Sequence, residues 1–541
     1  MNELKYIFRP ALVIACCILF SATAKSQILS KINYQSAIEK YNQDSLLKKI
    51  DWNIYELMTY VSERQYAKSN IPIDSIITSF KSPILQFDSQ GRLLCYLWLK
   101  EALPNRSLYL MLTNINEVRV ISSQEKFKFI EAYIPILNFM QIAKIRSIHQ
   151  ITPVSEGITN SGQILTEGDH ILNVDIARQK FGITGTGIRI GVISDGVTPN
   201  GQPVTSQNQL EQAATELPEV TNTLNGLNEQ GPQLWVMNNS KTPNTAEGAA
   251  MLEIVHDLSP DADLLFYTAW PTPIPPGDAN FLSEAINALA TSGCNVIVDD
   301  VASLDQPYFE ENSGISAPVF EAINDFVNNG GCYISSAGNY AFNHIENQFS
   351  DIDNNTYHNF SQNDEELNFT LQPEQAIFFY CQWSNEWGNA SSAINLEIWR
   401  NSILGDELVA VSNIPVGGIP FISIGYENQN LLLNQSCYLK LRNAVGPANY
   451  RFKIFYFYYH RNPEQELVRV SGFVDEYINQ NGSIFGHSFF DNSIAVAAIS
   501  GQPDQPQNNT YEITEDFSSM GPVLLCVDFE NQIFEQRNKP D

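Results

Sequence analysis

The chain has 541 residues, of which 43% are hydrophobic and 11% aromatic, so it has ample material for large cores. A chain of this length folds into about three or four units. It carries 31 Lys and Arg against 60 Asp and Glu, a formal net charge of −29. Because nucleic-acid binding depends on clustered cationic charge, we expect no nucleic-acid partner. The acidic surface fits a well-solvated exported protein.

A short apolar run lies near the start of the chain. Lys5 and Arg9 precede the run 11–20, and Ser21-Ala-Thr-Ala24 follows it. This pattern predicts a signal peptide over residues 1–24 and not a membrane-spanning helix. It has a basic start, a short apolar core and small residues before the expected cleavage site. We therefore expect a secreted or otherwise exported protein without a transmembrane segment.

The cysteines beyond residue 24 are widely scattered. Their spacing matches no metal site, so we predict no metal ligands among them. An exported route permits disulfides, and Cys381 with Cys437 is the one pair that we consider. Cys294 and Cys332 lie in apolar strand contexts, which are typical of buried thiols.

Residues 25–155 form the first predicted unit. The pattern indicates helices over 34–49, 52–66 and 136–145, and strands over 84–99, 108–112, 118–121 and 145–151. Strands and helices that do not alternate regularly predict a small α+β unit. A polar linker over 155–162 and a helix over 169–181 follow.

Residues 170–344 alternate strands with helices. Buried strands are predicted at 187–194, 234–237, 263–269, 295–300 and 332–336, and helices at 246–256, 281–292 and 318–329. This alternation is typical of a parallel sheet with helices on both faces. We expect Asn244 or Thr245 to cap the helix that starts at 246.

The chain is organised around the stretch Gly187-Ile-Arg-Ile-Gly-Val-Ile-Ser-Asp-Gly-Val197. Its β-branched run indicates a strand buried on both faces, and Asp195 stands at the carboxyl end of that strand. Open α/β sheets place their chemistry at this end of their strands, so Asp195 is a candidate functional residue. The alternative is an aspartate that caps the next turn.

Residues 345–470 contain many short alternating segments separated by turn residues, a pattern that predicts an all-β sandwich. Another apolar strand follows at 493–499. The economical interpretation is a β-sandwich inserted into the α/β unit, which continues over 471–541. The sequence as a whole therefore predicts an α/β fold with an all-β insertion and an N-terminal α+β region.

Three motifs resemble those of subtilisin-like serine peptidases, the subtilases. Gly191-Val-Ile-Ser-Asp-Gly196 resembles the aspartate motif, and Ser335-Ser-Ala-Gly-Asn339 resembles the motif whose Asn donates to the oxyanion. Phe517-Ser-Ser-Met-Gly-Pro522 resembles a later turn. The resemblance covers about 170–541 without the insertion, and it implies proteolysis of polypeptide substrates, with Asp195 and Asn339 as site residues.

The histidine motif departs from the subtilase pattern. Glu247-Gly248 stands where His-Gly is expected, and this glutamate resembles the sedolisin branch, which uses Ser, Glu and Asp. In sedolisins the partner Asp lies four residues after the Glu, where this chain has Met251, so the partner would be Asp195. We expect these carboxylates to share charge, which raises one pKa and shifts the pH optimum to acid. The alternative role for Glu247 is a first-turn glutamate that the helix dipole favours. His256, nine residues on, points to the opposite face of the helix.

The nucleophile motif of subtilases is Gly-Thr-Ser, and it occurs nowhere in these 541 residues. In the family it follows a Lys-Pro-Asp segment, where this chain has Lys539-Pro-Asp541. We expect no turnover without an activated nucleophile. The chain is then either truncated or complemented by a serine from a separate segment, and Ser518 and Ser519 are interpreted as turn formers.

The remaining expectations concern substrate and partners. Asp299 and Asp300 end the strand that lines the substrate channel in subtilases, so they are candidates for an acidic substrate-binding wall, with solvated loop acids as the alternative. The resemblance places residues 25–155 where a propeptide lies, and it requires no cofactor but leaves a structural calcium open. His487 is expected to be a structural histidine.

A different class of function is open too. In this alternative the chain is a catalytically inert secreted binding protein, whose aromatic-rich sandwich contacts peptide or glycan. The aromatic residues in question are Trp383, Trp387, Trp399 and those from Phe455 to Tyr459.

Overall fold

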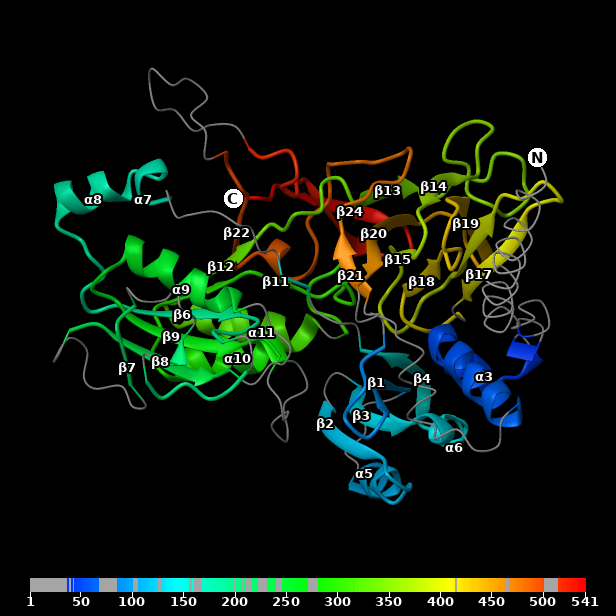
Figure 1. Ribbon diagram of the computed structural model, residues 1–541, viewed down its shortest axis with the longest axis horizontal. Coiled ribbons are helices and arrows are strands. Elements are labelled where there is room, and N and C mark those ends of the chain that lie inside the picture. Colours follow the sequence, from blue (N-terminus) through cyan, green and yellow to red (C-terminus); the bar gives the residue numbers. More distant parts are fainter. Residues whose placement is uncertain are drawn as a thin grey trace, which may run out of the picture.

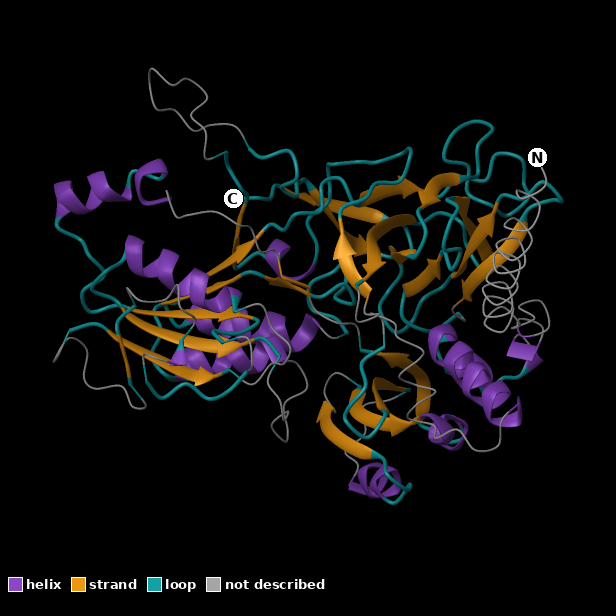
Figure 2. Cartoon of the chain, viewed as in Figure 1, coloured by secondary structure: helices purple, strands orange, loops and turns teal. Residues whose placement is uncertain are grey.

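A computed structural model describes residues 37–541. It leaves out short stretches, at 38–39, 42, 68–84, 101–105, 125–127, 155–157, 160–167, 199–200, 207–208, 211–216, 222–230, 240–245, 271–280, 315, 414–415, 463–466 and 501–513. The predicted signal peptide lies outside the described residues. Helices, strands and their arrangement are shown in Figure 1 and Figure 2.

The N-terminal unit is a four-stranded antiparallel sheet with helices around it. The strand order is β2-β3-β1-β4, with every neighbouring pair antiparallel. Its elements are η1 (Leu47–Lys49), α3 (Trp52–Ala67), β1 (Arg92–Leu99), α5 (Arg106–Thr113), β2 (Arg119–Gln124), β3 (Phe129–Pro135), η2 (Ile136–Asn138), α6 (Phe139–Ala143) and β4 (Ile148–Pro153).

One predicted strand of this unit is wrong. Residues 108–112 form part of the helix α5. The reason lies in the spacing of its apolar residues, since Leu108 and Leu112 are buried whereas Tyr109, Leu110 and Met111 are exposed. Burial at positions four apart is the helical period, and a run of apolar letters alone hides it.

A parallel sheet of seven strands forms the α/β unit. The strand order is β22-β12-β10-β6-β9-β8-β7, and each neighbouring pair is parallel. The strands are β6 (Arg189–Ser194), β7 (Glu219–Val220), β8 (Gln233–Asn238), β9 (Asp263–Thr268), β10 (Val296–Asp299), β12 (Cys332–Ser336) and β22 (Ser493–Val496). After β6 the chain goes to the edge strand β7, returns through β8 to β9 beside β6, and then crosses to β10 on the other side of β6. The strand order therefore reverses at β6.

Helices cover both faces of this sheet, as the alternation predicted. Ala249 and Leu252 of α9 (Glu247–Leu258) pack on one face with Phe266. On the other face lie α10 (Phe281–Thr291) and α11 (Ser316–Asn328). The helix expected over 169–181 is split into α7 (Gly168–Ile171) and α8 (Val174–Phe181), because Asn173 adopts a left-handed backbone conformation.

The β-sandwich over residues 344–470 packs two antiparallel sheets. One has the order β13-β20-β15-β18, with β21 paired to β20, and the other has the order β14-β19-β16-β17. The strands are β13 (His344–Gln348), β14 (Leu367–Leu371), β15 (Gln375–Trp383), β16 (Ala393–Arg400), β17 (Glu407–Asn413), β18 (Phe421–Glu427), β19 (Gln435–Val445), β20 (Arg451–Arg461) and β21 (Leu467–Val470). Their inward side chains, such as Phe369 and Phe379, form one apolar core. Cys381 and Cys437, which we considered as a disulfide, are both free and buried.

The chain then returns to the parallel sheet through η4 (Gly486–Phe489), and β23 (Val523–Asp528) and β24 (Ile533–Arg537) form a hairpin. A further pair joins β5 (Ile158–Thr159) to β11 (Val301–Ala302). This pair brings the segment after the N-terminal unit next to the end of β10.

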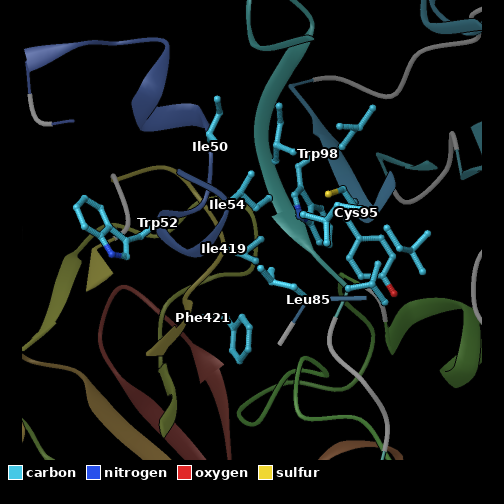
Figure 3. Close-up of a cluster of buried hydrophobic side chains, with 14 of the residues drawn as sticks. Ile50, Trp52, Ile54, Leu85, Cys95, Trp98, Ile419 and Phe421 are labelled. Carbon is cyan, nitrogen blue, oxygen red and sulfur yellow. The ribbon is translucent and has the colours of Figure 1, made fainter. Parts of the chain in front are cut away.

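The N-terminal unit packs against the sandwich through a shared apolar cluster. In Figure 3, Ile50, Trp52 and Trp98 of the N-terminal unit lie close to Ile419 and Phe421 of the sandwich. Hydrogen bonds frame this contact, because Asn53 donates to Ser423 and the main chain of Ile419 donates to the side chain of Gln150. The units therefore share one continuous core.

Candidate functional site

Asp195 lies buried directly after the central strand β6. The turn that carries it is fixed by the end of the neighbouring strand β9. The hydroxyl of Thr268 donates to the main-chain carbonyl of Asp195 over 2.7 Å, and the main-chain N–H of Ala269 donates to Ser194 over 2.9 Å. The carboxylate therefore stands at the carboxyl end of the sheet, beside the point where the strand order reverses.

The first turn of α9 meets this carboxylate. The main-chain N–H of Glu247 donates to Oδ1 of Asp195 over 3.1 Å, so the two residues are in contact through the main chain of Glu247. Gly248 makes the approach feasible, since a Cβ there would lie 2.3 Å from the Phe266 ring and 2.7 Å from the carbonyl of Gly196. A carboxylate at a helix start also accepts an otherwise unpaired N–H.

The start of α9 differs from the sequence prediction in one respect. Ala246 occupies the N-cap position with a left-handed backbone and makes no side-chain cap. The expected caps, Asn244 and Thr245, lie outside the described residues. Asp195 supplies a capping acceptor from another strand, which local sequence cannot reveal. His256 is in the last turn of α9, at the end far from Asp195.

Asn339 is carried by a turn after β12, two strands from β6 in the sheet. Gly338 before it has a φ of 89°, which suits glycine, and Tyr340 follows it. The main-chain N–H of Ser519 donates to the carbonyl of Gly338 over 2.8 Å, and the hydroxyl of Ser519 accepts the N–H of Tyr340 over 3.0 Å. Two motifs far apart in sequence therefore clamp the residues on either side of Asn339.

The two serines of the Phe517–Pro522 turn are structural, as expected. Ser518 and Ser519 are fully buried. The hydroxyl of Ser518 accepts the main-chain N–H of Ala498 over 3.0 Å, and the hydroxyl of Ser519 is engaged with Tyr340. Their hydrogen bonds fix the turn, and none of them involves Asp195 or Glu247.

The carboxyl end of β10 carries Asp299 and Asp300. Asp299 is buried, and its Oδ1 accepts the hydroxyl of Ser335 over 3.0 Å and the main-chain N–H of Val301 over 3.3 Å. Asp300 is half-buried and leads into β11. The Asp299 carboxylate thus faces the interior in this structure, and the substrate-binding role of the pair stays a prediction.

His487 organises a buried polar cluster that the sequence did not reveal. Its Nε2 lies 3.0 Å from Oδ1 of Asp299 and 3.2 Å from Oγ of Ser335, while Nδ1 lies 3.2 Å from the side-chain oxygen of Gln306. The hydroxyl of Ser488 donates to the carbonyl of Ser336 over 2.8 Å. The cluster therefore joins the end of β10, the end of β12 and η4.

This Ser–His–Asp trio does not have the geometry of a catalytic relay. In a relay one ring nitrogen serves the serine and the other is held by the carboxylate. Here the same nitrogen of His487 faces both Ser335 and Asp299, and all three side chains are buried. The expectation of a structural histidine agrees with these contacts.

No group of three or more His, Cys, Asp or Glu side chains suited to a metal occurs in the part of the chain that the structure describes. Within the same residues, no helix is long and apolar enough to cross a membrane.

Comparison with known proteins gives weak likenesses. No family model matches the sequence, and no curated protein matches it. Among solved structures, the epidermin leader peptide processing serine protease of Staphylococcus aureus is 16% identical, with 47% of this chain and 62% of that chain covered and a TM-score of 0.29. The CspB protease of Clostridium perfringens is 10% identical, with 70% and 84% covered and a TM-score of 0.33. A lanthipeptide protease is 17% identical, with 34% and 52% covered and a TM-score of 0.21.

These similar structures are all proteases, and this chain spans less than two thirds of the length of the first. TM-scores this low do not establish a common fold. The assignment of the candidate site therefore depends on the contacts among its own residues.

Proposed function

We propose that this chain is an exported protein of the serine-peptidase type, which carries the acid–base and oxyanion parts of a site for polypeptides. The observation that supports this most is the contact between Asp195 and the first residue of α9, Glu247, at the carboxyl end of the central strand. Asn339 stands on a clamped turn at the same end of the sheet.

Each residue has a chemical role in this proposal. Asp195 and Glu247 form a carboxylate pair that takes the proton of a serine hydroxyl, which a carboxylate does when its environment raises its pKa. The amide of Asn339 donates to the oxyanion that develops on the substrate carbonyl. Asp300, half-buried beside β11, is the member of its pair that we propose for contact with substrate.

The nucleophile is not among the residues assigned. No Gly-Thr-Ser occurs in the sequence, and Ser518 and Ser519 are held in a buried turn. The proposal therefore requires a serine supplied by another segment, placed within hydrogen-bond reach of the acid pair. Residues 25–155 are proposed to act as a propeptide-like unit, and the pairing of β5 with β11 supports a link between that unit and the site.

The rival proposal of an inert binding sandwich is left with two of the aromatic residues that suggested it. The aromatic residues from Phe455 to Tyr459 are buried, and so is Trp383, and they pack in the interior on both faces of their sheet. Trp387 and Trp399 are half-buried, so a peptide or glycan contact through this unit would have to use them.

A fluorophosphonate probe tests the proposal, because it labels only activated serines. We compare the 541-residue chain with the same chain carrying any segment that its gene encodes after residue 541, from pH 3 to pH 8. The proposal expects labelling of the longer chain, lost in the Asp195→Asn and Glu247→Gln variants. Equal labelling of these variants would refute the assigned acid pair.

A further inference from the structure

Two neighbouring loops of the β-sandwich expose large aliphatic side chains. The first joins β16 to β17 and carries Ile403 and Leu404, which are 101% and 94% exposed. The second joins β18 to β19 and carries Leu431, Leu432 and Leu433, which are 59%, 77% and 65% exposed. Aliphatic residues gathered at such exposure mark a contact site.

The loops adjoin one another. The main-chain N–H of Asn401 donates to the carbonyl of Ser436 over 2.9 Å, and its side chain donates to the hydroxyl of Ser436 over 2.9 Å. Strand register agrees, since Arg400 pairs with Cys437. The strands β17 and β19 lie on the side of the molecule far from the parallel sheet (Figure 1). We call these two loops, residues 401–405 and 428–434, the aliphatic tip.

The tip is built to hold its shape while its side chains point outward. The side-chain oxygen of Asn430 accepts the N–H groups of Leu432 and Leu433 over 2.9 and 3.0 Å. Asn428, which is buried, donates to the carbonyl of Leu433 over 2.9 Å. In the first loop the hydroxyl of Ser402 accepts the N–H of Leu404 over 3.3 Å. Several backbone groups of the tip therefore already have partners, which lowers the cost of moving it into an apolar medium.

The aliphatic tip contains no charged residues, and the nearest ones lie at its base. Neither loop contains Asp, Glu, Lys or Arg. At the base, Arg400 pairs with Glu407, and Asp406 accepts the hydroxyl of Tyr438 over 3.0 Å. An uncharged aliphatic end with a charged collar enters the boundary between headgroups and acyl chains without burying a charge.

We propose that the aliphatic tip is a peripheral lipid-binding site, which inserts into the surface of an uncharged bilayer. A loop end whose aliphatic side chains are mostly or fully exposed inserts readily into a soft medium, whereas a protein partner would need a groove of matching shape. The residue types agree, because protein hot spots favour Trp, Tyr and Arg, and Leu is under-represented there. The net charge of −29 favours a zwitterionic surface over an anionic one.

Flotation of the full chain with phosphatidylcholine vesicles tests the site. The chain should float with the vesicles, with little effect of salt, because apolar insertion is not screened. The double variants Ile403→Ser/Leu404→Ser and Leu432→Ser/Leu433→Ser should each lower the partition coefficient at least tenfold. Their side chains are exposed, so both variants should fold normally.

The matched control is Ile352→Ser, which removes an aliphatic residue that is 55% exposed on the loop before β14, at the opposite end of the sandwich. It should float like the parent chain. Binding that needs phosphatidylglycerol and disappears in salt would overturn the proposal, as would flotation unchanged in both double variants. Failure to float, with self-association that the double variants abolish, would instead assign the tip to contacts between copies.

Discussion

The main-chain N–H of Glu247 donates to Oδ1 of Asp195 over 3.1 Å, although 52 residues separate the two in the chain. This one contact gives Asp195 two roles. It accepts a hydrogen bond at the start of α9, and it brings the first residue of that helix to the end of the central strand. The alternatives of a capping aspartate and a functional aspartate are therefore compatible.

Removal of the Asp195 carboxylate should destabilise the α/β unit. In Asp195→Ala the start of α9 loses an acceptor, and losses of this kind cost about 1 kcal/mol. Asp195→Asn keeps an oxygen acceptor and should lose less. Urea unfolding measures both, with Glu535→Ala on the exposed surface as the control. An alanine variant as stable as the parent would show that α9 does not depend on this contact.

Addition of one methyl group at Gly248 should push α9 away from Asp195. The new Cβ would overlap the Phe266 ring and the carbonyl of Gly196, which are fixed parts of the core. Overpacking of this kind costs roughly 1–3 kcal/mol. The control is Ala250→Gly at an exposed position of the same helix, which should cost about 1 kcal/mol through helix propensity alone. Thermal unfolding that ranks Gly248→Ala as the milder change would contradict the close approach.

The buried cluster around His487 should behave as one unit. His487→Ala removes the ring whose Nε2 lies 3.0 Å from the buried carboxylate of Asp299, so we expect a loss of roughly 1–3 kcal/mol. Adding Asp299→Asn should recover part of that loss, because the group left without its hydrogen-bond partner is then an uncharged amide. Chemical denaturation of the two single variants and the double variant gives the coupling, with exposed His170→Ala as the control. Strictly additive losses would mean that the two side chains do not interact.

Acid should weaken the fold through His344. Burial and the nearby Lys453 lower the pKa of His344 to about 4, from an ordinary value of 6.5. Between these values the unfolded chain takes up a proton that the folded chain refuses, so stability is full above pH 6.5 and falls towards pH 4. The loss is roughly 3 kcal/mol. His344→Gln should make stability less steeply dependent on pH over this range, and buried His358, whose pKa is also lowered to about 4, should account for a further part of the slope.

Glu131 should act in the opposite direction. Burial raises its pKa to about 8, and Asp305 adds to the shift. The unfolded chain ionises this group near pH 4.5 while the folded chain keeps it protonated, so stability falls as pH rises from 4.5 to 8. The total is roughly 5 kcal/mol. Glu131→Gln should raise stability at neutral pH, as measured by urea unfolding at several pH values, and an unchanged pH slope would contradict this assignment.

Much of the architecture follows from local patterns. The β-branched run before Asp195 predicted the central strand because a strand buried on both faces has no polar alternation. The alternation of strands and helices predicted the parallel sheet, and short alternating segments predicted the sandwich. The strand predicted at 108–112 was wrong because a continuous apolar run hides the helical spacing of its buried residues.

The parts that sequence could not give depend on contacts between distant segments. The whole β-sandwich lies between His487 and its partners Asp299 and Ser335 in the sequence. The residues next to His487 form a Gly-His-Ser turn and do not indicate these partners. The main-chain N–H at the start of α9 is capped by Asp195, which comes from a strand far away in the sequence. The adjacency of the two exposed loops is likewise a result of strand register.

The most direct test of the central claim is fluorophosphonate labelling of the chain together with any segment that its gene encodes after residue 541. The account predicts labelling of a serine in that segment, abolished by Asp195→Asn and by Glu247→Gln in proteins that still unfold cooperatively. Labelling of a serine within residues 37–541, or labelling that survives both substitutions, would contradict the assignment of Asp195 and Glu247 as the acid–base pair.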